Sequence, residues 1–167
     1  MANTVTFSGH FQSKLTTTET FSGADTANNT VTLDGDDEDF TLTGTTTPAI
    51  TKVSRFTITL SAGAATLDLT AIPGLTPNET IDGTGLKVQA IKFTPSSGNA
   101  NPITASKGGT NGYGLTAAGT TWSIPMDAGQ SSLRNTNNAA PAIGGSAKTI
   151  DFAGTGSQTI KVTIWLG

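Results

Sequence analysis

The chain has 167 residues, enough for one domain with a sizeable core. Only 13% of them are charged and the net charge is −3, so the sequence lacks the basic stripe that direct nucleic-acid binding needs. The absence of Cys excludes disulfides, thiol catalysis and cysteine-based metal sites. We find no secretion signal and no apolar run long enough to cross a membrane. These features predict a protein that is made in the cytoplasm and binds no membrane.

Short alternations of apolar and polar residues recur along the N-terminal part of the chain, at 4–8, 11–15, 30–34 and 40–44. This period of two is typical of β-strands with one buried face. An acidic, glycine-containing segment, 35–39, separates the last two of these strands and predicts a hairpin between them.

The same alternation continues at 55–61, 64–70, 122–126, 149–154 and 157–167. Ala62 and Gly63 predict a tight turn between the first two of these strands. Pro125 cannot donate to a β-ladder and predicts a sheet edge or a strand end. The alternation changes phase between Leu86 and Phe93, which predicts a β-bulge or a strand that passes from one sheet to another.

Residues 99–113 and 130–148 show little periodicity and predict two long loops, which in compact domains often serve binding. A glycine-rich stretch in the first, 107–114, superficially resembles a phosphate-binding loop but lacks the required spacing. We expect its glycines to provide positive φ in a tight turn.

About ten short strands with many turns predict an all-β fold, a single antiparallel β-sandwich of jelly-roll type that spans residues 1–167. A closed β-barrel is the alternative. Residues 1–20 are either the first strands of the sandwich or a docking arm.

The acidic segment supplies the candidate metal ligands, Asp34, Asp36 and Glu38, because closely spaced carboxylates can hold a hard cation such as calcium. Their spacing fits no EF-hand loop, and a solvated hairpin tip that discourages aggregation explains the same residues.

Catalytic signatures are missing from the sequence. His10 is the only histidine and has no nucleophile signature near it, and we find no phosphate-binding or metalloprotease motif. We therefore expect no catalytic residues, no cofactor and no enzymatic activity.

The large amphipathic aromatic residues are candidates for contacts, because such side chains serve both sugar binding and subunit interfaces. Tyr113 and Trp122 could line a ligand site, and both could equally be packing residues. Trp165 lies on the face of the terminal strand opposite to Ile164 and Leu166, which makes it an interface candidate.

Five segments of the sequence carry a resemblance, both in their residues and in their order along the chain: 67–75, 83–93, 99–113, 122–129 and 148–167. In wording and order this part of the chain resembles small structural proteins encoded beside the head genes of tailed phages. The resemblance covers roughly residues 67–167 and implies a virion component, a capsid decoration (cement) protein that is β-rich and oligomeric.

Taken together, the resemblance and the composition predict a non-enzymatic protein on the capsid surface of a phage, made in the host cytoplasm. Its partner would be the major capsid protein, and it would form a ring, with a homotrimer favoured. The candidate interface residues are Phe7, Phe11 and Trp165. The alternative is a glycan-binding or host-receptor-binding module of a tail fibre or adhesin, with Tyr113 and Trp122 in its site.

Overall fold

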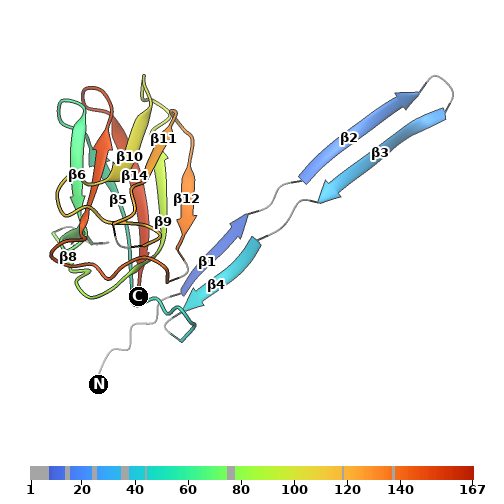
Figure 1. The fold of residues 1–167 in the computed structure, drawn as a ribbon. Coiled ribbons are helices and arrows are strands. Elements are labelled where there is room, and N and C mark those ends of the chain that lie inside the picture. The colour runs from blue at the N-terminus through green and yellow to red at the C-terminus, as the bar shows by residue number, and fades with distance from the viewer. Residues whose placement is uncertain are drawn as a thin grey trace.

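The computed structural model describes residues 8–13, 16–23, 26–34, 38–43, 45–74, 78–117, 119–136 and 138–167. Its described part is all-β, and Figure 1 shows a sandwich with an arm that projects from one end. No helix that could span a membrane is present among these residues.

Eight strands form the two sheets of the sandwich, and all pairs within them are antiparallel. The first sheet has the order β12-β9-β14-β5 and the second β11-β10-β13-β6. The bounds of the first sheet are β5 Lys52–Thr59, β9 Val88–Pro95, β12 Ser132–Asn135 and β14 Thr159–Leu166. Those of the second are β6 Ala64–Asp68, β10 Ile103–Lys107, β11 Ser123–Met126 and β13 Thr149–Ala153.

The pairing order of these strands is that of a jelly roll. In chain order the first of the eight strands pairs with the last, the second with the seventh, the third with the sixth and the fourth with the fifth. Such nested pairing is one long antiparallel ladder rolled up into two sheets. The predicted jelly-roll sandwich is confirmed, and the sheets do not close into the alternative barrel because each ends in its own edge strands.

Strand β14 alternates as the sequence predicts. Ile160, Val162, Ile164 and Leu166 are buried, whereas Lys161 is exposed and the remaining outward side chains are half-buried. The strand lies between β9 and β5 and pairs with both along most of its length.

The predicted phase change in β9 is a β-bulge. Trp165 lies opposite Ala90, but the next residue, Leu166, lies opposite Val88. Gln89 is therefore the extra residue, and it shifts the alternation so that Val88 and Ile91 both face the core.

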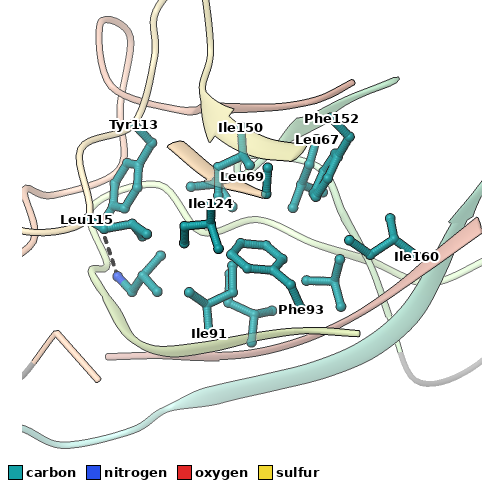
Figure 2. Close-up of a cluster of buried hydrophobic side chains, with 14 of the residues drawn as sticks. Leu67, Leu69, Ile91, Phe93, Tyr113, Leu115, Ile124, Ile150, Phe152 and Ile160 are labelled. Atoms are coloured by element: carbon teal, nitrogen blue, oxygen red, sulfur yellow. Dashed lines mark hydrogen bonds between the residues drawn. The ribbon is translucent and has the colours of Figure 1, made fainter. Parts of the chain in front are cut away.

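The core fills the space between the sheets, as Figure 2 shows for one cluster of its side chains. Phe93 of β9 stacks on Trp122 with ring centroids 6.3 Å apart. It also meets the edge of Phe152 of β13, with centroids 5.8 Å apart. These ring contacts join one sheet to the other at the centre of the core.

Two local predictions are confirmed. Ala62 and Gly63 have φ of 49° and 85°, as in the two-residue turns that favour glycine. They form the turn between Ser61 and Ala64, which pair in an antiparallel bridge. Pro125 lies in β11, which is an edge strand.

The prediction of two long loops is wrong in one respect, because each segment contains a strand. Residues 99–113 include β10, which is paired on both sides, and residues 130–148 include β12 at a sheet edge. The local pattern is weak because β10 is short and only Ile103 and Ala105 are fully buried in it. Its neighbours in the sheet, rather than its own periodicity, determine its conformation.

The arm consists of two two-stranded ladders. Strand β1 (Ser8–Ser13) pairs with β4 (Glu38–Thr43), and β2 (Thr16–Gly23) pairs with β3 (Thr26–Asp34). The predicted hairpin between 30–34 and 40–44 is therefore wrong, because β3 and β4 each pair with an earlier strand. Of the acidic segment, Glu38 and Asp39 begin β4, and residues 35–37 fall outside the described part.

Two further elements complete the described fold. Strands β7 (Ile72–Pro73) and β8 (Thr80–Ile81) form a small antiparallel ladder. The arm joins the sandwich where the amide of Ile50 donates to the carbonyl of Thr43 over 2.8 Å.

We predict that the sandwich folds without the arm, because its two sheets and the core between them are built from residues 50–167. Deleting residues 1–43 should leave the urea midpoint and the slope of unfolding nearly unchanged. A large loss of stability in the truncated chain would show that the arm contributes to the core. The matched control is Phe93→Ala in the full chain, which should cost about 3–5 kcal/mol.

Candidate interaction surface

Each sheet of the sandwich has one face in the core and one outer face, and the two outer faces differ in charge. In the first sheet, all four strands have outward positions that alternate with the positions facing the core. We call this outer face of β12-β9-β14-β5 the basic face. Its members are Val53, Arg55, Thr57, Ala90, Lys92, Thr94, Leu133, Asn135, Lys161, Thr163 and Trp165.

Strand register places the cations of the basic face close together. Lys92 and Arg55 lie opposite Thr163 on its two sides, and Lys161 lies two residues along the same strand. With strands about 4.8 Å apart, the backbones of Lys92 and Arg55 are about 10 Å from each other. All three cations are exposed, and within the described part of the chain no ion pair joins any of them to a carboxylate.

Apolar side chains lie beside these cations. Trp165 is half-buried on the outer face, between Val53 and Ala90 in register. Leu133 of the edge strand lies opposite Lys92 and is 37% exposed, more than any other large hydrophobic side chain in the described part of the sandwich. A surface that combines an aromatic ring, a leucine and exposed cations has the composition of an interface.

One end of the basic face is hollowed. A shallow, open depression of about 420 Å³ lies there, lined by Thr57, Thr94, Ser96, Ser97, Gly129 and Lys161. Its lining is mostly hydroxyl groups with one amino group.

The outer face of the second sheet carries carboxylates that are already bound. Asp151 accepts from the Thr66 hydroxyl over 2.7 Å and from the Gly109 amide over 2.8 Å. Asp68 accepts from Lys148 over 2.9 Å. The Thr70 hydroxyl, and then Lys148, lower the pKa of Asp68 to about 2.

The arm is strongly acidic. Residues 1–43 contain one lysine and seven Asp or Glu, a net charge of −6, whereas residues 44–167 contain eight Lys or Arg and five Asp or Glu, a net charge of +3. Together these give the net charge of −3 for the whole chain. The charge of the protein is thus divided between two parts of opposite sign.

The predicted ligand residues Tyr113 and Trp122 do lie together, but as packing residues. Tyr113 has no exposed surface, so it does not line a surface site, which corrects that prediction. Its hydroxyl donates to the Pro141 carbonyl over 2.7 Å. It also accepts from the Val88 amide over 3.0 Å, the bond that the dashed line in Figure 2 marks. The indole of Trp122 donates to the Tyr113 carbonyl over 2.7 Å and is half-buried against Phe93.

The glycine-rich loop at 107–114 is not built to receive phosphate. The amide of Gly109 is taken by Asp151, and the amides of Gly108 and Tyr113 by the Thr149 carbonyl. Our expectation of positive φ at its glycines is wrong, because the residue with φ of 52° is Asn111. Gly108 is required for another reason, because a Cβ there would lie 2.1 Å from the Thr149 hydroxyl.

Within the described residues, the candidate metal ligands are not seen to form a metal site. Asp34 ends β3, Glu38 begins β4, and Asp36 lies outside the described residues. Among the residues that are described, no group of three or more metal-binding side chains gathers.

The three candidate interface residues lie in different places. Phe7 falls outside the described residues, and Phe11 lies in β1 opposite Phe40. Trp165 lies on the basic face. Sequence reasoning found this tryptophan but missed the cations around it. The alternation in β5 and β14 points Arg55 and Lys161 outward, but only strand pairing brings Lys92 beside them.

Comparison of the chain with protein-family models, with curated proteins and with solved structures finds no match.

We predict that Tyr113 titrates abnormally. Burial raises the pKa of its phenol to about 12, against a smaller opposing effect of the Val88 amide. The pKa is raised in the folded state only. The contribution of Tyr113 to the free energy of unfolding is therefore complete below pH 10 and is lost as the pH rises through about 12. Tyr113 is the only tyrosine, so absorbance at the phenolate band reports on it alone.

The control is the same titration in denaturant, where the midpoint should fall near the ordinary value of about 10. If the folded protein titrated with the same midpoint as the denatured protein, this would contradict the burial of the Tyr113 ring.

We also predict an acid-dependent loss of stability at Asp68. Its pKa is lowered in the folded state, so its stabilising effect is present above about pH 4 and is lost as the pH falls through about 2. Asp68→Asn should be less stable than the wild type at pH 7, by about 0.5–1 kcal/mol because the pair is partly exposed. The two proteins should converge at pH 2 in denaturant unfolding. A constant difference at both pH values would contradict this role.

Proposed function

We propose that this protein is a non-enzymatic structural protein of a phage virion, which decorates the capsid and stabilises it by bridging capsid subunits. The observation that carries the proposal is the combination of a compact jelly-roll sandwich with a projecting arm on one chain (Figure 1). Two binding elements that face different directions allow one molecule to contact two neighbours. The resemblance of residues 67–167 to head-associated phage proteins supports the particular location.

The proposed mechanism is mechanical clamping. Contacts that are spread over neighbouring capsid subunits must all be lost before the shell can expand or rupture, which raises the barrier to both. A sandwich suits this task because nearly all of its buried strand positions are filled by close-packed apolar side chains. The partner would be the major capsid protein, and a ring of three copies would match the local threefold points of a capsid.

Jelly rolls occur in viral capsid proteins and in lectins alike, so the fold by itself favours neither function. The glycan-binding alternative depends on exposed aromatic platforms. Tyr113 is buried, and Trp122 is half-buried with its indole nitrogen already bonded to a carbonyl. The basic face offers three cations and a tryptophan instead, which suits a protein partner better than a neutral sugar.

The test is the copy number of the protein in purified virions, measured by quantitative mass spectrometry against the major capsid protein. We expect a number comparable to that of the capsid protein. We also expect capsids without the protein to release their DNA at a lower temperature, and addition of the purified protein to restore the original temperature. Absence from the virion, or only a handful of copies, would overturn the proposal of a decoration protein.

A further inference from the structure

The arm is a structure that needs a partner. An isolated two-stranded ladder is at best marginally stable in water, because both of its faces and both of its edges are exposed. Figure 1 shows β1–β4 extending away from the sandwich of their own chain. In the ladder of β1 and β4, Phe11 lies opposite Phe40 and Gly9 lies opposite Leu42, so these positions share one face.

The second ladder repeats this arrangement. Leu33 lies opposite Thr17 and Val31 opposite Glu19, so the two apolar positions of β3 share one face. The other face of the ladder pairs Thr18 with Thr32 and Thr20 with Thr30. By register, the apolar positions of the two ladders share their sides with Glu38 and Glu19 respectively, and residues 1–43 carry a net charge of −6.

The basic face of the sandwich has the complementary properties. Its charges are Arg55, Lys92 and Lys161, and within the described residues none of them is paired with a carboxylate. Its apolar part is formed by Trp165, Val53 and the exposed Leu133. Three like charges at neighbouring positions of one face repel, and an acidic partner would relieve this repulsion.

We propose that the arm of one copy of this chain binds the basic face of a second copy. The apolar positions of the arm would cover Trp165 and Leu133, and Glu38, which shares the side of Phe40 by register, would lie among the three cations. Asp34 and Asp39 lie on the opposite side of the ladders by register and would add to the negative field of the arm. The contact joins two different surfaces, so it is head-to-tail and either closes into a ring or continues as a chain. It concerns the isolated protein in solution and does not depend on the proposed function in a virion.

The first test is sedimentation velocity of the full chain over a range of concentrations. At about 20 mM salt we expect concentration-dependent association of the wild type, weakened roughly tenfold or more at about 500 mM salt because exposed charges are then screened. A wild-type chain that stays monomeric at about 100 µM and low salt overturns the proposal, and so does association that does not respond to salt.

The second test is a charge swap, which identifies the two surfaces. The face variant is Arg55→Glu/Lys92→Glu/Lys161→Glu, and the arm variant is Asp34→Lys/Glu38→Lys/Asp39→Lys. Each variant alone should be monomeric, because the face variant presents an acidic arm to an acidic face and the arm variant has lost the net negative charge of its arm. A mixture of the two should associate again, because the acidic arm of the face variant then meets the unchanged basic face of the arm variant. Association of either variant alone, or no association in the mixture, would show that the arm and the basic face do not bind each other.

A third comparison separates local charge from net charge. Arg55→Gln/Lys92→Gln/Lys161→Gln and Ala64→Asp/Ser123→Asp/Ala153→Asp both lower the net charge of the chain by the same amount. The second set is exposed and lies in the second sheet, away from the basic face. Only the first should weaken association, and equal weakening by both would contradict a specific site. The mutated face residues are all exposed, and circular dichroism and melting curves confirm that each variant is folded.

Discussion

The structure depends on the position of β14 between β9 and β5. This strand is paired on both sides, and its four inward side chains are fully buried. It closes the nested ladder, because the last strand of the roll must pair with the first. The bulge at Gln89 follows from the same constraint, since only an extra residue in β9 keeps Val88 in register with Leu166 while Ile91 still faces the core.

Tyr113 shows how the sandwich is sealed at one end. Its ring is buried, its hydroxyl joins the Val88 amide to the Pro141 carbonyl, and its own carbonyl receives the indole of Trp122. A buried polar group is stable only when it is hydrogen-bonded, and here the bonds connect β9 with two connecting segments. The aromatic residues that look most like a ligand site in the sequence are therefore part of the packing.

The surface that remains available for interaction is defined by charge rather than by shape. The outer face of the second sheet binds its own carboxylates, through Thr66, Gly109 and Lys148, whereas the cations of the basic face have no such partners in the described part of the chain. The acidic arm carries the opposite charge at the other end of the sequence. The charge of the chain is therefore divided between an acidic arm and a sandwich with a basic outer face.

The sequence by itself determined the fold class, the terminal strand, the change of phase within 86–93, the turn at Ala62 and the position of Pro125 at a sheet edge or strand end. All of these follow from local rules, the period of two and the backbone limits of glycine and proline. Only the tertiary structure decided the partner of each strand. The short strand β10 pairs with β11 and β13, and β4 with β1 rather than with β3. It also decided that Tyr113 is buried and that Lys92 joins Arg55 and Lys161 on one face, because pairing between strands far apart in the chain determines register, and register determines which side chains become neighbours.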